Sequence, residues 1–372
     1  MELDEILTKA VKLGASDIHL KVGSVPKARI KTVVRPVEGF DIIKSEDMMK
    51  FISKILAGSE SKKNELIKNG ETDLSYSIQS LSRFRVNILK QRGTYAIVLR
   101  VIKTEPPKFE NLILPEVIKK IAEEPIGLVL VTGPTGSGKS TTLAAMIDYR
   151  NESFEETIIT IEDPIEYVFK DKKAYIVQRE VGMDTQSFNS GLRAALREDP
   201  DVIMIGEMRD LETIQTALRA AETGHFVLST LHTQDAKDTI SRIINMFPGE
   251  EQNHLRILLA AVLKAVISQR LIPRKDGKGV VPAVEVLINT GAITECIMDP
   301  DKFLLINDYM EKGKKIYGTQ TFDQSVIDLY NQGLISYENA LMYASNPSDV
   351  ELKIKGITAG EDEGLDFGGF TY

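Results

Sequence analysis

The chain has 372 residues, 42% of them hydrophobic, which excludes a fully disordered or fibrous polypeptide and suits about two domains. The 46 basic and 54 acidic residues leave a formal charge of −8, which argues against non-specific nucleic-acid or anionic-membrane binding as the main activity. Cys296 is the only cysteine, so an intrachain disulfide and a multi-thiolate zinc site are both excluded.

The sequence predicts no transmembrane segment. No stretch approaches the roughly 18 uninterrupted apolar residues of a membrane helix, and the charged start lacks the apolar core of a signal peptide. The most apolar candidate, residues 257–267, is interrupted by Lys264 and is predicted to be a buried or interface helix. We therefore expect a cytoplasmic protein whose partners are proteins and small molecules.

Residues 1–103 are predicted to form a small α+β domain. Apolar residues alternate at 17–22, 74–78 and 84–88, which indicates strands with one buried face. Ser45 is predicted to cap a helix between the first two strands. Residues 104–116 are predicted to be a linker, because Pro106 and Pro107 favour an extended chain.

Strand and helix patterns alternate over residues 117–298, which predicts an α/β core with a parallel sheet. Residues 299–358 are predicted to be short helices, with Ser336 as a cap, and residues 359–372 an acidic disordered tail. The predicted core strands are residues 127–131, 157–161, 202–205 and 226–231, with a further strand at 280–287.

A phosphate-binding loop follows the first core strand. The residues are Gly133, Pro134, Thr135, Gly136, Ser137, Gly138, Lys139 and Ser140, which fit G-x-x-x-x-G-K-[ST] in full. Such a loop surrounds phosphate oxygens with backbone amides at the positive end of a helix. We expect Lys139 to reach the β and γ phosphates of ATP, Ser140 to hold Mg²⁺, and Thr141 to complete the site. The alternative is a glycine-rich turn that binds nothing.

The other core strands also end in polar groups. Ligands of open parallel sheets bind beyond the carboxyl ends of the strands, where Glu162, Glu207 and His232 lie in the sequence. The usual metal-binding aspartate is replaced by Gly206, and Asp199 and Asp201 precede their strand. Glu207 is therefore predicted to be the general base and Glu162 the metal-side carboxylate, acting through water. The alternative is that both glutamates are solvated loop acids.

Histidines and arginines give weaker signals. His232 is predicted either to sense the γ phosphate or to be a buried structural residue, and His225 to have an interface or structural role. Arg83 and Arg85 share the strand face opposite the core, and Arg100 has a similar position. These arginines are either surface charges or contacts to a nucleotide held by an adjacent subunit.

Together these motifs resemble the secretion ATPase superfamily, and most closely its PilT-like type IV pilus retraction ATPases. The resemblance implies a PAS-like amino-terminal domain, a RecA-like P-loop ATPase core and a homo-hexameric ring. It also implies work on pilin at an inner-membrane platform protein, on the cytoplasmic face of that membrane. Glu162 and Glu166 would form the Asp box, Glu207 the catalytic glutamate, and His225 and His232 the His box. The matching segments are residues 14–20, 82–87, 133–140, 161–167, 197–210 and 223–233.

Two features bear on the direction of the motor. Extension and secretion members of the superfamily typically carry extra amino-terminal domains, and many have a four-cysteine zinc element, which this chain lacks. The first feature favours the retraction branch. The second does not, because residues 292–299 keep only the alanine, the isoleucines and the final acid of the retraction motif A-I-R-N-L-I-R-E. An extension, secretion or DNA-uptake motor, a P-loop kinase and a nucleotide-switched binding module therefore stay open. A helicase is disfavoured by the acidic charge, so no direct nucleic-acid partner is expected.

Overall fold

The computed structural model describes residues 1–79, 81–102 and 105–356, which form two compact units. The first unit joins Met1–Lys108 to Ile147–Glu207, and the second joins Phe109–Met146 to the described residues from Met208 onward. The chain first leaves one unit for the other inside the predicted linker 104–116. The other predicted domain boundaries stay predictions, and the predicted disordered tail 359–372 lies outside the described residues.

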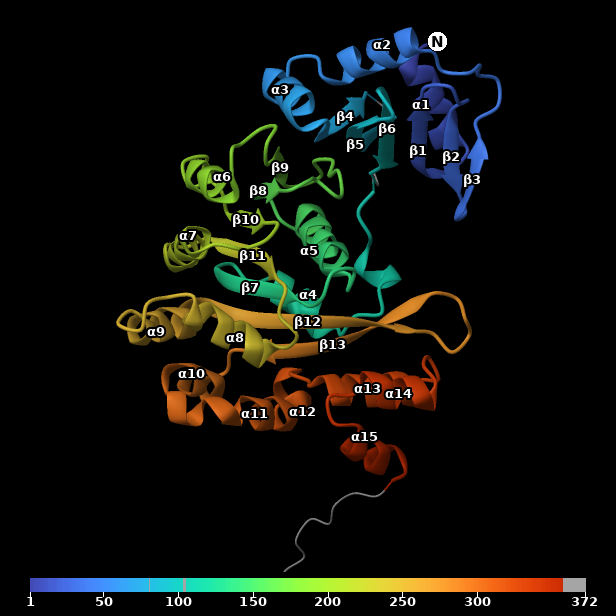
Figure 1. Ribbon diagram of the computed structural model, residues 1–372. Helices are drawn as coiled ribbons and strands as arrows, with labels where there is room; N and C mark the ends of the chain where they lie inside the picture. The colour runs from blue at the N-terminus through green and yellow to red at the C-terminus, as the bar shows by residue number, and fades with distance from the viewer. Residues whose placement is uncertain (80, 103–104, 357–372) are drawn as a thin grey trace, which may run out of the picture. The chain divides into compact units, whose positions relative to one another are not determined.

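The amino-terminal part of the first unit is an antiparallel sheet with helices packed on it (Figure 1). Its strands lie in the order β3-β2-β1-β6-β5-β4. Phe84 and Val86 of β5 are buried while Arg85 is exposed, as the alternating pattern predicts. The elements are α1 (Leu3–Lys12), β1 (Ala15–Lys21), β2 (Lys27–Ile30), β3 (Val33–Pro36), α2 (Ser45–Ile55), α3 (Glu60–Asn69), β4 (Glu71–Ile78), β5 (Ser82–Gln91) and β6 (Thr94–Val101).

The predicted cap of α2 is wrong by one residue. Ser45 is the first residue of the helix, and the N-cap position belongs to Lys44. The backbone amide of Lys44 donates a hydrogen bond to Asp47 Oδ2 at 3.1 Å, so an acid of the first turn stabilises this helix end from within the helix.

The rest of the first unit is a parallel layer of strands in the order β10-β8-β9. All of β10 (Val202–Ile205) and nearly all of β8 (Thr157–Glu162) are buried, as is typical of parallel strands covered on both faces. The strand β9 (Tyr175–Glu180) was not predicted, because it is half exposed and its last three residues are polar. The helix α6 (Phe188–Ala195) packs on β8.

The second unit is built on four strands in the order β13-β12-β7-β11. The strands β7 (Gly127–Thr132), β11 (Phe226–Leu231) and β12 (Leu263–Pro273) are parallel, and β13 (Val280–Ile288) is antiparallel to β12. Its other elements up to residue 262 are η1 (Phe109–Asn111), α4 (Val117–Ala122), the first half of α5 (Lys139–Ser153), α7 (Leu211–Glu222), α8 (Ala236–Asn245) and α9 (Gln252–Val262).

The predicted helix at residues 257–267 is confirmed as far as Val262 and wrong beyond it. Helix α9 ends at Val262, and Leu263 already has extended backbone angles and begins β12. A short apolar run does not distinguish a buried helix from a buried strand. The β-branched Val266 and Ile267 favour the strand that forms.

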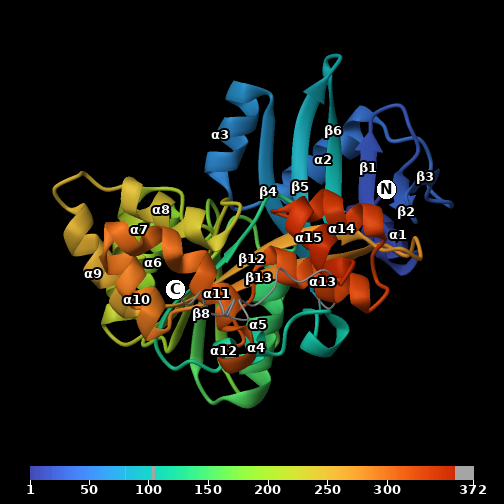
Figure 2. The same cartoon turned by 90° about the horizontal axis from the view of Figure 1, so that it is seen from below.

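Short helices follow β13, as predicted. Helices α13 to α15 pack against β12 and β13 around Phe322 and Val326 (Figure 2). The predicted cap at Ser336 is confirmed, because its side chain accepts a hydrogen bond from the backbone amide of Asn339. The elements are α10 (Gly291–Met298), η2 (Pro300–Leu305), α11 (Ile306–Lys312), α12 (Lys314–Tyr317), α13 (Phe322–Asn331), α14 (Tyr337–Tyr343) and α15 (Pro347–Ile354).

The predicted fold class is confirmed: an α/β protein with a smaller amino-terminal α+β part and carboxy-terminal helices. Among the described residues, none of the helices has the length and apolar character needed to cross a membrane.

Candidate nucleotide site

The phosphate-binding loop lies in the second unit, between β7 and α5. Gly133, Gly136 and Gly138 have φ angles of 138°, 81° and 95°, which non-glycine residues rarely adopt. A Cβ atom at Gly133 would lie 2.4 Å from Gln269 O and 2.6 Å from Ser137 Oγ. The loop therefore needs glycine here both for its backbone angle and for space.

Lys139 and Ser137 place polar groups against this loop. The Nζ of Lys139 donates hydrogen bonds to Gly133 O at 2.8 Å and Pro134 O at 3.1 Å, and the side chain is buried. The buried Oγ of Ser137 has no hydrogen-bond partner among the described residues. A buried ammonium and a hydroxyl donor in a glycine-rich loop at a helix N-terminus are the groups that bind phosphate.

His232 lies at the same edge of the second unit as the loop. Strand β11 runs parallel to β7 with Leu231 paired to Thr132, so His232 follows β11 where Gly133 follows β7. His232 is exposed, which removes the alternative of a buried structural histidine. His225 is half buried, and its Nδ1 lies 2.9 Å from Ala220 O of α7, which supports the structural role predicted for it.

A cavity of about 380 Å³ adjoins the loop within the second unit, and the sequence did not reveal it. Ser137, Gly138 and Thr141 line one side. Leu271 and two cations of the β12–β13 hairpin, Arg274 and Lys278, line another. Apolar walls with a few cations suit the base and sugar of a nucleotide. The only sequence signal was the basic segment at residues 274–278, which is easily taken for a solvated turn.

The first unit brings Glu162 and Glu207 to one edge. Strand β10 runs parallel to β8 with Ile205 paired to Ile161, so Glu207 and Glu162 both lie at the carboxyl ends of their strands. Both side chains are buried, at 7% and 8% exposure, which is contrary to the alternative of solvated loop acids.

Asp201 is excluded from this edge, as predicted. It precedes β10, and its Oδ2 accepts a hydrogen bond from the backbone amide of Thr157, the first residue of β8. Asp199, two residues earlier, also precedes the strand and is exposed.

Hydrogen bonds fix the carboxylate of Glu162. Its Oε1 accepts from Thr160 Oγ1 at 2.6 Å and from Gln178 Nε2 at 3.1 Å, and its Oε2 accepts from the backbone amide of Glu166 at 3.4 Å. Burial raises the pKa of Glu162 to about 7, although the bonds from Thr160 and Gln178 act in the opposite direction. Because both oxygens are engaged within the chain, the group suits contact with a metal through water.

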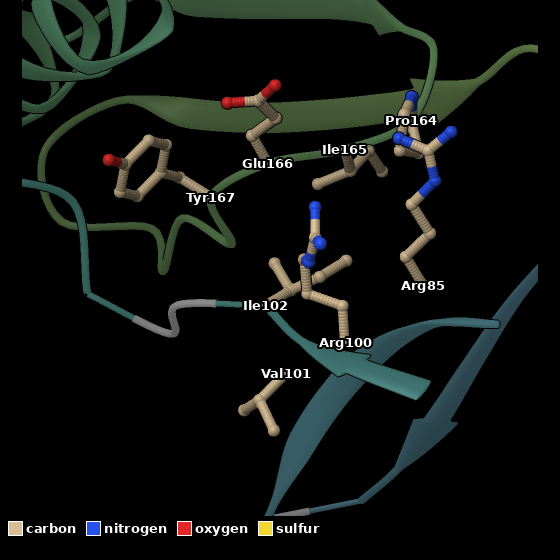
Figure 3. Close-up of a pocket in the computed structure, with 8 residues that line it drawn as sticks. All are labelled: Arg85, Arg100, Val101, Ile102, Pro164, Ile165, Glu166 and Tyr167. Carbon is tan, nitrogen blue, oxygen red and sulfur yellow. The ribbon is translucent and has the colours of Figure 1, made fainter. Parts of the chain in front are cut away.

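The arginines fall into two sets. Arg85 and Arg100 line a cavity of about 270 Å³ with Glu166, and Figure 3 shows both side chains rising toward Pro164 and Ile165. The Nε of Arg100 also lies 3.0 Å from Asp17 Oδ1, and the Arg100 side chain is 70% exposed.

Arg83 has a different environment from Arg85 and Arg100. It forms an ion pair of 2.9 Å with the buried Glu180, so the described chain already supplies a partner for its guanidinium. Arg83 is therefore neither a simple surface charge nor an arginine that shares the cavity.

Metal binding by side chains alone has no support in the described chain. None of its His, Cys, Asp and Glu residues form a group of three or more that could hold a metal ion.

Comparisons with known proteins point to one family. The model of the family described as type II/IV secretion system protein matches residues 1–315. The type IV pilus retraction ATPase PilT of Pseudomonas aeruginosa is 45% identical over 349 residues, covering 94% of this chain and 100% of that protein. The twitching motility protein of Neisseria gonorrhoeae is 49% identical over 279 residues, covering 75% of this chain and 74% of that protein.

A solved structure supports the same relationship. The crystal structure of the pilus retraction motor PilT with bound ADP has a TM-score of 0.85 and 46% identity to this chain. The match covers 94% of this chain and 99% of that one.

Proposed function

The chain belongs to the type II/IV secretion system protein family and is an ATPase, and we propose that its ATP hydrolysis drives the retraction of a type IV pilus. The observation that carries this proposal is the full-length match to a retraction ATPase, which spans 94% of this chain and all of the relative. The complete phosphate-binding loop agrees with it.

The loop and its lysine bind the phosphates. Backbone amides of Gly133 and residues 135–138 donate to the β and γ phosphates, the ammonium of Lys139 offsets their charge, and the hydroxyl of Ser140 would hold Mg²⁺. The base and sugar occupy the cavity lined by Thr141, Leu271 and Arg274. Bound magnesium supplies positive charge to the phosphate oxygens.

Buried carboxylates carry out the hydrolysis. Glu207 orients and deprotonates the attacking water, for which a buried glutamate at a strand end is suited. Glu162 lies on the metal side and acts through water, and His232 reports the state of the γ phosphate. Arg85 and Arg100 reach the nucleotide of an adjacent subunit and stabilise the charge of the transition state.

The working form is a homo-hexameric ring at the cytoplasmic face of the inner membrane, where it moves pilin through the platform protein. The degenerate segment 292–299 falls on α10 and the residue after it, so contact with the platform differs from that of relatives with the full motif. An extension motor of the same family is the second candidate, because both arginines of the retraction motif are absent there.

Phosphate release with ATP and Mg²⁺ tests the enzymatic part, with mass followed by light scattering. Wild type is expected to turn over as a hexamer, Lys139→Ala to lose nucleotide binding, and Glu207→Gln to bind ATP without hydrolysis. Glu60→Gln is the matched control, because this glutamate is exposed on α3. Full turnover in Glu207→Gln would remove its assignment as the base.

Twitching assays test the direction of the motor. The chain is expressed in a bacterium that lacks its own retraction ATPase but still assembles pili. Restored twitching is expected, and restored pilus assembly in a strain without its extension ATPase would instead favour the second candidate. The Glu207→Gln variant controls for effects that do not need hydrolysis.

A further inference from the structure

Glu180 is a buried carboxylate that accepts three hydrogen bonds from three different segments. It is the last residue of β9 and only 3% exposed. Its Oε1 accepts from Ser75 Oγ at 2.6 Å, and its Oε2 accepts from Arg83 Nη2 at 2.9 Å and from the backbone amide of Ile165 at 3.1 Å. Ser75 lies on β4 and Arg83 on β5.

The third segment is the Asp box, residues 161–167, which contains Glu162 and Glu166. Ile165 follows β8 by three residues and lies between Glu162 and Glu166. In the sheet, Glu162 pairs directly with Glu180, and the backbone amide of Val181 donates to Glu162 O at 2.8 Å. One carboxylate thus joins the amino-terminal sheet to the segment 163–166.

The backbone of Glu180 is fixed as well as its side chain. Its amide donates to Asp184 Oδ2 at 2.8 Å, and its carbonyl accepts from the amide of Asp184 at 2.8 Å in the turn that follows β9. The backbone of Glu180 is therefore held on both sides by the turn that follows β9, and its carboxylate projects from this position.

Burial of a charged group is unfavourable unless it is paired and hydrogen bonded, and an apolar residue would pack the same space without that penalty. The Nε of Arg83 is also buried without a hydrogen-bond partner among the described residues. Such a network favours a single geometry. Because it holds Ile165 next to Glu166 and Arg83 on the same strand as Arg85, it also positions the cavity that Glu166, Arg85 and Arg100 line.

We propose that Glu180 is a positioning residue of the ATPase, which holds the Asp box against β4 and β5 through Ser75, Arg83 and Ile165. Arg83 then acts through Glu180 rather than on the nucleotide. This inference rests on the proposed roles of Glu162, Arg85 and Arg100 in hydrolysis. The binding of ATP by the phosphate-binding loop does not depend on Glu180, because that loop lies in the second unit.

The test compares Glu180→Gln, Arg83→Gln and the double variant with wild type. In Glu180→Gln an amide NH₂ group would face the buried donors of Arg83 and Ile165, so the bridge is expected to open. The kcat is expected to fall by about 10-fold or more, while the Kd of a fluorescent ATP analogue changes less than about 3-fold. The double variant is expected to lose no more than the worse single variant, because both changes break one network.

Hydrogen exchange supplies the readout that a merely stabilising residue would not move. The amides of Asp163 and of residues 165–167 are expected to exchange faster in Glu180→Gln at a temperature where the protein stays folded. The matched control is Asn87→Ala, since Asn87 bonds Asp73 across the same two strands and makes no contact with β9 among the described hydrogen bonds. It is expected to leave kcat and exchange unchanged.

Several results would overturn the inference. They are a kcat of folded Glu180→Gln within 2-fold of wild type, a loss that appears in the Kd instead, or unchanged exchange at Asp163 and residues 165–167. Additive losses of kcat from Glu180→Gln and Arg83→Gln would also contradict it. If mixed rings then recovered the activity of Arg83→Gln, Arg83 would be assigned to contact with the nucleotide of an adjacent subunit.

Milder variants keep the test usable if Glu180→Gln does not fold. Arg83→Lys keeps a donor and is expected to retain more activity than Arg83→Gln, and Ser75→Ala removes one of the three bonds, with a loss of about 2-fold to 5-fold in kcat. Equal activity of Arg83→Lys and Arg83→Gln would overturn the inference. The ATPase assignment fails separately, if wild type and Lys139→Ala release phosphate equally.

Discussion

Gln269 of β12 donates a hydrogen bond to the hydroxyl of Thr142 at 2.8 Å and so ties the first turn of α5 to the neighbouring strand. Both side chains are buried, at 1% and 2% exposure. The bond sits beside Gly133, whose missing Cβ leaves room for the carbonyl of Gln269. The strand that the sequence failed to predict is therefore a wall of the phosphate-binding loop.

This contact gives a prediction for stability. Gln269→Leu leaves the Thr142 hydroxyl buried without its partner, and the free energy of unfolding is expected to fall by about 1–3 kcal/mol. The double variant with Thr142→Val is expected to recover part of the loss, because both polar groups are then gone. Urea unfolding of the four proteins measures the coupling. Strictly additive losses would mean that the two side chains do not depend on each other.

The glycine at position 133 gives a prediction for binding. Gly133→Ala combines a left-handed φ with a Cβ 2.4 Å from a backbone oxygen, so the loop has to move. Strain of about 1–3 kcal/mol corresponds to about 5-fold to 150-fold weaker binding of ATP. Gly277→Ala is the matched control, since Gly277 also has positive φ but nothing lies within 4 Å of its Cβ position. Equal ATP affinity of both variants would contradict the prediction.

Glu285 of β13 gives a prediction for pH. Its side chain is 6% exposed, and its Oε1 accepts from the backbone amide of Ala236 at 2.8 Å. Burial raises its pKa to about 7 from an ordinary 4.5, although the bond from Ala236 acts in the opposite direction. The folded chain therefore holds this proton more tightly than the unfolded chain, and the group lowers stability as the pH rises from about 4.5 to about 7.

Glu285→Gln removes this effect. Relative to wild type, the variant is expected to gain about 1–3 kcal/mol in unfolding free energy at pH 8 compared with pH 5. Urea unfolding at both pH values measures the difference, with Glu60→Gln on the exposed face of α3 as the control. An equal difference between variant and wild type at both pH values would show that Glu285 keeps an ordinary pKa.

Arg85 gives a prediction for ring assembly. If it stabilises a nucleotide held by a neighbouring subunit, Arg85→Ala is expected to lower turnover in assembled rings by about 10-fold or more, with little change in ATP affinity. Mixing it with Lys139→Ala subunits is expected to restore part of the activity, because an intact loop and an intact arginine then meet at some interfaces. Arg92→Ala, in the turn after β5, is the control. Undiminished turnover in Arg85→Ala rings would make this arginine a surface charge.

The sequence predicted the buried strands well and the mixed ones poorly. Strands β7, β8, β10 and β11 fall within one residue of their predicted ends, because each is a mainly apolar run with at most two small hydroxyl residues in its interior. Strand β9 carries Gln178, Arg179 and Glu180 and has no such run. Strand β12 shares its apolar run with the end of α9, and composition alone does not place the boundary.

In the candidate site, too, features built from neighbouring residues were predicted and features built from distant segments were not. The phosphate-binding loop is contiguous and was predicted from the pattern of its residues. The pairing of Arg83 with Glu180, 97 residues away, and the cavity beside the loop arise from segments far apart in the chain. A single sequence carries no local signal for such contacts.

Gly206 lies close against two neighbouring elements, β8 and α6, which limits the residues that can replace it. A Cβ at this position would lie 3.3 Å from the carbonyl oxygen of Ile161 and 3.3 Å from the ring of Phe188. Any side chain at this position, including the aspartate that usually binds the metal ion in P-loop proteins, requires both the backbone of Ile161 and the ring of Phe188 to yield by a few tenths of an ångström. Substitution of Gly206 therefore depends on which residue occupies position 188 and on how far the backbone of Ile161 can yield.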